Sequence, residues 1–223
     1  MAELRKYGTC FFEQYAHISL ATLLGHEFDD LLNRDRPDLQ SPDGQRLGIE
    51  VTRAMEESKH AAGQMLKEIS GITEVKDDPD ELDLIIESGY SYGLELGRYV
   101  GRKELDYWRL ALPLQRILES KVTKAGNGFY GTYEKMGLYV FCKDPINDAD
   151  VIKAYRFVMG IQKYQDIRYN RLYLSEPTNL YVCNLDDGLS EASRMLRYPV
   201  TREMRREFYL EAVRLQLTSD RRP

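Results

Sequence analysis

One turn fixes the geometry of the most informative part of this chain. Ser41-Pro42-Asp43-Gly44 has the composition of a type I turn, with proline preset at its second position and glycine free to take a positive φ. Apolar residues recur at every second position after the turn, from Leu47 to Val51, as expected of a half-buried strand. The sequence therefore predicts a β-hairpin over residues 36–52, closed by a three-residue loop with a bulge.

The hairpin carries two acids, and its register sets their relative position. A three-residue loop puts Asp38 opposite Gly48 on the partner strand. Glu50 is then the diagonal neighbour of Asp38 on the same face, with roughly 7–8 Å between their Cα atoms. Gly48 has no side chain and leaves space beside the pair. A two-residue loop would separate the two acids. The opposite face of the hairpin receives apolar residues, namely Leu39, Leu47, Ile49 and Val51.

Two carboxylates that converge from adjacent strands suit a hard divalent cation. Mg²⁺ usually takes one or two protein carboxylates and fills its octahedron with waters and phosphate oxygens. Asp38 and Glu50 are therefore candidate ligands for Mg²⁺ or Mn²⁺, and the carbonyl of Val51 is a further candidate. The alternative is that Asp38 is an ordinary turn residue and that Glu50 faces solvent on a half-buried strand.

The order Pro37-Asp38, eleven residues, Glu50-Val51-Thr52 resembles the PD-(D/E)XK nuclease superfamily. The resemblance implies a restriction-endonuclease-like fold and a metal-dependent phosphodiesterase that hydrolyses DNA. The last position of the signature, a lysine in the family, is Thr52 here. Threonine can hydrogen-bond a water or a phosphate but supplies no positive charge. Either a lysine from elsewhere takes that catalytic role, or the chain is an inactive nuclease-fold module that binds nucleic acid or protein. Hydrolysis of another phosphate ester is a third alternative.

Displaced lysines occur in the family that this sequence resembles, and three lysines here are candidates for the role. Lys121 and Lys124 lie three residues apart near the end of a helix predicted over residues 103–124, and Lys59 follows the hairpin. The alternative for Lys121 and Lys124 is exposed charge on an amphipathic helix.

The opening helix adds two acids to the candidates. Its apolar spacing runs over residues 9–32, with an interruption or an end near Gly25. In branches of the family, an acid on this helix reaches the metal site, so the resemblance implies that role for Glu13 or, as the weaker candidate, Glu27. The alternative for Glu13 is a first-turn glutamate that the helix dipole favours.

The remaining pattern predicts an α/β protein. Strongly apolar strands alternate with amphipathic helices, which indicates a mixed central sheet flanked by helices in one domain over residues 1–223. The predicted order is a helix at 56–69, a helix at 78–87, an ambiguous tract at 88–101, the helix at 103–124, a central strand at 138–142, a helix at 148–163, strands at 171–174 and 180–183, and a closing helix at 201–217.

Composition limits the class of protein. No apolar run approaches the roughly 20 residues of a membrane span, and the first residues do not resemble a signal peptide. The 3 cysteines are widely spaced, which favours reduced thiols in a cytoplasmic protein. A net charge of −5 does not itself predict nucleic-acid binding, but a bound metal would add positive charge. The expected partner is nucleic acid, with DNA first and no membrane, and a homo-oligomer is left open. The 16 tyrosines could stack on unpaired bases, or fill a core or interface, which is their commoner use.

Overall fold

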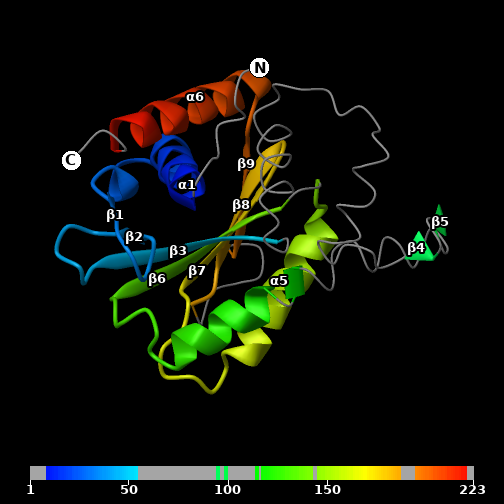
Figure 1. Cartoon of the computed structure of the whole chain (residues 1–223). Helices are drawn as coiled ribbons and strands as arrows, with labels where there is room; N and C mark the ends of the chain where they lie inside the picture. The colour runs from blue at the N-terminus through cyan, green and yellow to red at the C-terminus, as the bar shows by residue number, and fades with distance from the viewer. Residues whose placement is uncertain are drawn as a thin grey trace.

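A seven-stranded mixed sheet forms the centre of the protein (Figure 1). The computed structural model describes residues 9–54, 94–95, 98–99, 114–115, 117–142, 145–186 and 194–219. Across the sheet the strand order is β1-β2-β3-β6-β7-β8-β9. The strands are β1 (Leu32–Asn33), β2 (Leu39–Gln40), β3 (Leu47–Arg53), β6 (Lys135–Phe141), β7 (Arg171–Glu176), β8 (Asn179–Asn184) and β9 (Met195–Pro199).

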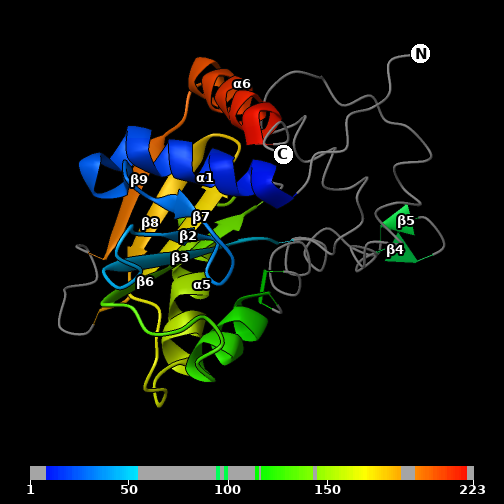
Figure 2. The ribbon, with the colours of Figure 1, turned by 60° about the vertical axis from the view of Figure 1, so that its left-hand side comes forward.

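Helices cover both faces of this sheet (Figures 1 and 2). Helices α1 (Thr9–Leu24) and α6 (Arg202–Ser219) pack on one face, and the short 3₁₀ helix η1 (His26–Phe28) follows α1. Helix α5 (Asp148–Ile161) and a helical segment at residues 117–126 pack on the other face. The chain therefore has three layers, as expected for an α/β protein.

The parallel strands explain which helices share a face. Strands β3, β6 and β7 are parallel neighbours, so each connection between them crosses the sheet in the same direction. Such crossovers are almost always right-handed, which places both connecting helices on one side. The helical segment 117–126 and α5 are those helices. Strand β6 lies between β3 and β7 and is buried on both faces, which accounts for its continuous apolar sequence.

Most of the predicted elements are confirmed. The opening helix ends at Leu24, before Gly25 with φ +92°, and the predicted central strand is β6. Helices α5 and α6 and strands β7 and β8 lie at the predicted positions. The edge strands β1 and β9 were not predicted. The predicted helices at 56–69 and 78–87 lie outside the described residues, and the tract at 88–101 contains the antiparallel pair β4 (Leu94–Glu95) and β5 (Arg98–Tyr99).

The turn of the hairpin is as predicted, but the register is not. The amide of Gly44 donates to the carbonyl of Ser41 at 2.8 Å, and Gly44 has φ +67°. However, Ser41 pairs with Leu47, so the loop spans residues 42–46 rather than three residues. The cause is Asp43, whose carboxylate accepts hydrogen bonds from the amides of Gln45 and Arg46 and thereby holds a wider loop.

The prediction of free space beside Gly48 is wrong as well. A Cβ atom at this position would lie 2.8 Å from Cγ of Pro37 and 2.9 Å from the ring of Tyr133. Glycine is required here because two rings pack against the backbone of β3. The apolar face of the hairpin is as predicted, since its four apolar side chains all join the core beneath α1 and α6. In the part of the chain that the structure describes, no helix combines the length and the apolarity needed to cross a membrane.

Candidate functional site

Asp38 and Glu50 lie directly opposite each other on one face of the sheet. Leu39 pairs with Ile49, so the next position along each strand brings Asp38 against Glu50. The register differs from the predicted one by an even number of residues, and an even shift keeps both acids on the same face. Directly opposed residues have Cβ atoms about 5 Å apart, which is closer than the diagonal arrangement that the sequence predicted.

Asp38 stands where β2 separates from β3, and it takes over a backbone hydrogen bond there. Hydrogen-bonded pairs recur at every second residue of an antiparallel ladder, so the Ser41–Leu47 pair implies that the amide and carbonyl of Val51 face the β2 side. Strand β2 begins only at Leu39 and does not reach a position opposite Val51. The amide of Val51 donates instead to Oδ2 of Asp38 at 2.7 Å. The carbonyl of Val51 points to the same edge, which is the position that the sequence analysis gave to a third ligand.

Lys121 reaches Glu50 from the helical segment at residues 117–126. Its Nζ lies 2.6 Å from Oε1 of Glu50, and the two side chains are 18% and 8% exposed. Of the lysines considered from sequence, Lys121 is thus brought to the acid pair. Lys124 is not, because its Nζ lies 5.5 Å from the ring centroid of the exposed Phe129. Lys59 lies outside the described residues.

The site holds more negative than positive charge. The pKa of Asp38 is raised to about 7, mainly by burial and then by the charges of Glu50 and Glu13, while the Val51 amide and Lys121 act in the opposite direction. Three carboxyl groups therefore act on one another beside Lys121, and Asp35 and Arg53 add one charge of each sign near Glu13. Such a site gains free energy from any further cation.

The opening helix contributes Glu13 and not Glu27. Glu13 lies at the edge of the site, where Asn33 of β1 donates a hydrogen bond to its Oε2 at 2.6 Å. Burial raises the pKa of Glu13, and the charge of Glu50 acts in the same direction against the hydrogen bond from Asn33. Glu27 instead forms an exposed ion pair with Lys135 at 3.0 Å.

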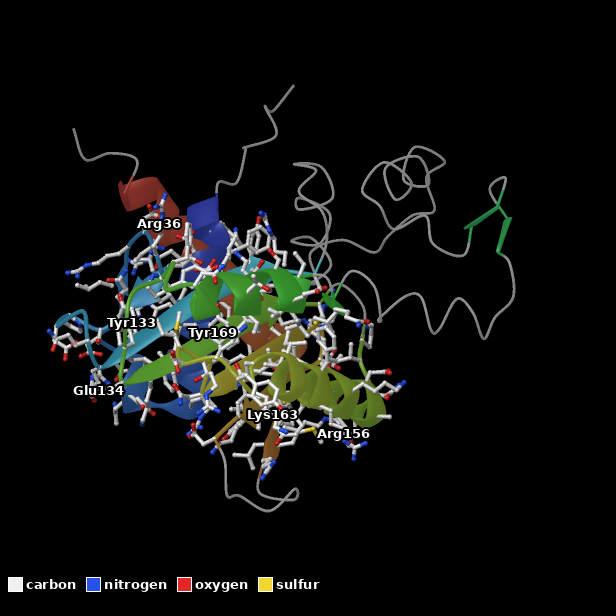
Figure 3. All side chains as sticks on the ribbon, turned by 90° about the horizontal axis from the view of Figure 1, so that it is seen from below. Arg36, Tyr133, Glu134, Arg156, Lys163 and Tyr169 are labelled. Atoms are coloured by element: carbon white, nitrogen blue, oxygen red, sulfur yellow. The ribbon has the colours of Figure 1, made fainter. Side chains whose placement is uncertain are left out.

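The sequence analysis missed two tyrosines at this site. Tyr130 is 3% exposed, and its buried hydroxyl has no hydrogen-bond partner among the described residues. Burial raises the pKa of Tyr130, and Glu50 and Asp38 act in the same direction while the Tyr169 hydroxyl opposes them, so the Tyr130 hydroxyl lies close to both Glu50 and Tyr169. The hydroxyl of Tyr169 contacts the carbonyl of Lys121 at 3.5 Å. In Figure 3, Tyr169 lies beneath the helical segment that carries Lys121. Only their crowding in the second half of the chain marked these tyrosines in the sequence.

The carboxylate oxygens at the site fit a divalent ion with few protein ligands. The bonds from Val51 and Lys121 go to Oδ2 of Asp38 and to Oε1 of Glu50, and the carbonyl of Val51 lies at the same edge. The described side chains include no group of three or more His, Cys, Asp or Glu with the geometry of a metal site. Mg²⁺ does not need such a group, because water and substrate oxygens complete its coordination.

Thr52 completes the set of sequence candidates. It follows Glu50 by two residues on β3, so it lies on the same face of the sheet, and it is half-buried. Lys121 brings an ammonium group from another element to Glu50, two residues before Thr52. No family model matches this chain, and no curated protein or solved structure matches it either.

Proposed function

We propose that this protein is a divalent-metal-dependent phosphodiesterase of the PD-(D/E)XK nuclease type that hydrolyses nucleic acid, with DNA as the first substrate to test. The observation that carries the proposal is the group formed by Asp38, Glu50 and Lys121. Two acids from neighbouring strands and a lysine from a separate helix meet on one face of the sheet. An acid pair with a lysine beside it combines affinity for a cation with a donor for a phosphate oxygen.

Asp38 and Glu50 are the residues that would hold Mg²⁺ or Mn²⁺, with the carbonyl of Val51 as a further ligand. When bound, the ion supplies a Lewis acid that polarises the phosphate and activates water for attack. The ladder of β3 fixes the backbone at Glu50, and the bond from the Val51 amide orients the carboxylate of Asp38. Glu13 adds negative charge at the edge, which strengthens the attraction for a cation.

Lys121 is the residue that would contact the phosphate. A lysine ammonium has three donors, and Glu50 uses one of them. The others can donate to a phosphate oxygen whose negative charge grows as the reaction proceeds, and this lowers the barrier. The Tyr130 hydroxyl is a neutral donor at the same place, because it lies near Glu50.

A cleavage assay tests this proposal. Labelled single-stranded DNA, double-stranded DNA and RNA are incubated with Mg²⁺ or Mn²⁺ and with wild type, Asp38→Asn, Glu50→Ala, Lys121→Ala or Lys153→Ala. We expect metal-dependent cleavage by wild type and by Lys153→Ala, whose lysine is an exposed residue of α5 that pairs with Asp150 at 3.0 Å. Asp38→Asn and Glu50→Ala should be inactive. Lys121→Ala should lose turnover while Mn²⁺ still raises its melting temperature.

The same assay distinguishes the enzyme from an inactive relative of the fold. If wild type cuts none of the substrates above the Glu50→Ala background, the nuclease proposal fails. The chain is then better described as a binding module, in which Lys121 neutralises Glu50 in place of a metal ion. If Lys153→Ala is as inactive as Glu50→Ala, the loss in Lys121→Ala is not specific to that lysine, and the role given to Lys121 is wrong.

A further inference from the structure

An exposed aromatic ring packs against Tyr130 of the site and contacts two cations. Phe129 is 46% exposed. The guanidinium carbon of Arg36 lies 4.9 Å from its ring centroid, and Nζ of Lys124 lies 5.5 Å from it. The three residues come from different places, namely the segment before β2, the helical segment 117–126 and the turn that follows it. We call them the Phe129 platform.

Each member of the Phe129 platform is close in sequence to a residue of the site. Arg36 precedes Asp38 by two positions, and Lys124 is one helical turn after Lys121. Phe129 is followed by Tyr130, and the two rings pack edge to face with centroids 5.2 Å apart. Tyr130 therefore connects the platform to the acids, because its ring supports Phe129 and its hydroxyl lies near Glu50.

We infer that the Phe129 platform binds an unpaired nucleobase and its phosphate, so that the substrate of the proposed nuclease is single-stranded nucleic acid. This inference rests on the proposed function and names its substrate class. An aromatic face accepts any base by stacking, whereas the bases of an intact duplex are already stacked on each other. Arg36 and Lys124 supply the positive charge that a phosphate needs next to a site rich in carboxylates.

The contacts of Arg36 and Lys124 are weak enough for both cations to bind a phosphate. Arg36 pairs with Asp35 at 3.4 Å, but both side chains are largely exposed, and exposed pairs of this kind contribute little. Lys124 contacts the Phe129 ring and is exposed to solvent. A phosphate can therefore replace the weak contacts of both cations without exposing a buried charge.

The chain also contains a control for chemistry without position. Tyr164 is 90% exposed, and Nζ of Lys163 lies 5.2 Å from its ring centroid. This pair has the same combination of an aromatic ring and a cation. In Figure 3, Lys163 lies on the opposite side of the view from Arg36, near the end of α5. A non-specific effect of any exposed ring and cation should appear equally at Tyr164.

Binding of labelled oligonucleotides tests the inference without any need for hydrolysis. Fluorescence anisotropy is measured for a 12-nucleotide DNA strand, the same sequence as RNA, its DNA duplex and a free mononucleotide, with full-length wild type, Phe129→Ala, Phe129→Leu and Tyr164→Ala. We expect wild type to prefer the single strands to the duplex. Phe129→Ala should bind the strands about 5- to 150-fold more weakly, which corresponds to the loss of about 1–3 kcal/mol of stacking on one base. Phe129→Leu should be nearly as weak as Phe129→Ala, and Tyr164→Ala should match wild type.

Two further readouts separate stacking from charge. A strand that carries 2-aminopurine should lose fluorescence on binding to wild type and keep it with Phe129→Leu, because an aliphatic side chain does not stack as an aromatic ring does. Arg36→Ala and Lys124→Ala should each reduce the slope of log K against log salt concentration by about 0.7, the value for one phosphate contact on a single strand.

The outcomes distinguish this inference from the proposed function. If Phe129→Ala binds the strands as wild type does, or if Tyr164→Ala loses as much affinity, the platform is not a binding site, whatever the cleavage assay shows. If wild type prefers the duplex, the substrate class is wrong. If wild type cleaves nothing but Phe129→Ala loses affinity for the strands, the platform stands and hydrolysis fails. Preference for the mononucleotide over the strands would overturn the assignment of a polymeric substrate.

Discussion

Nζ of Lys121 lies 2.6 Å from Oε1 of Glu50, so an ion pair with little solvent exposure joins a helix to the middle of β3. The two residues are far apart in sequence, and each is half of a pair that the fold assembles. Loss of one partner of such a pair leaves an uncompensated charge in a poorly solvated place, which is far costlier than the loss of both.

Lys121→Met should therefore lower the free energy of unfolding by about 3–5 kcal/mol in urea denaturation at neutral pH. Methionine keeps most of the aliphatic stem and removes only the ammonium group. Lys124→Met is the control, because Lys124 is exposed one turn later, and it should change stability by less than about 0.5 kcal/mol. The double variant Glu50→Leu/Lys121→Met should recover most of the loss. Losses that simply add in the double variant would contradict a direct interaction.

Stability should depend on pH through Asp38. The pKa of Asp38 is raised from 3.8 to about 7 in the folded protein, with burial as the main cause. The folded state thus keeps a proton that the unfolded state releases, so this stabilising contribution is full below about pH 4 and is lost as pH rises through about 7. The difference in free energy of unfolding between wild type and Asp38→Asn should fall by on the order of 1–4 kcal/mol over that window. A difference that stays constant with pH would show that Asp38 is normally ionised.

The close packing around Gly48 gives a test of the hairpin register. Gly48→Ala should lower the free energy of unfolding by about 1–3 kcal/mol, because its Cβ would collide with the rings of Pro37 and Tyr133. Gly160→Ala in α5 is the matched control. It meets no atom within 4 Å, so it should raise stability by about 0.5–1 kcal/mol through its better helix propensity. If both variants are stabilised in thermal or urea denaturation, the rings do not pack on Gly48.

Local chemistry made the hairpin predictable from sequence, and long-range packing limited that prediction. The turn at residues 41–44 is encoded by its own proline and glycine, so its type and the positive φ of Gly44 follow directly. The loop length depends on which backbone amides the Asp43 carboxylate accepts from, and composition does not specify this. Asp38 and Glu50 share a face although the predicted register was wrong, because the alternation of side chains determines the face and not the register.

The sequence assigned the candidate catalytic lysine to a helix but could not decide between two lysines on that helix. Helical periodicity placed Lys121 and Lys124 on one amphipathic element, yet the rotation of that element against the sheet depends on its buried side chains. Leu118 and Val122 lie in the core, and this packing turns Lys121 toward β3 and Lys124 toward Phe129. The position of Tyr130 could not be predicted from sequence for the same reason. It depends on how the end of the helix contacts the sheet beside Glu50.

The substitution Tyr130→Phe tests whether the hydroxyl of Tyr130 serves catalysis or stability. Its hydroxyl is buried without a described partner, so Tyr130→Phe should leave the stability of the metal-free protein unchanged or raise it by about 1 kcal/mol. Tyr181→Phe is the control, because it removes a hydrogen bond to the carbonyl of Ile146 and should cost about 1 kcal/mol. Both free energies are measured by urea denaturation, beside cleavage rates with Mn²⁺.

In the cleavage assay the two variants should behave in the opposite order. Tyr130→Phe should lower turnover about ten-fold or more, because a donor beside Glu50 would contribute most as charge develops on the phosphate. Tyr181→Phe should cut at nearly the rate of wild type, since its hydroxyl contacts the backbone of Ile146. A marked loss of stability in Tyr130→Phe would mean that its hydroxyl has a structural partner. Full turnover in a stable Tyr130→Phe would mean that the hydroxyl does not face the substrate, and only Asp38, Glu50 and Lys121 would remain as the centre of the site.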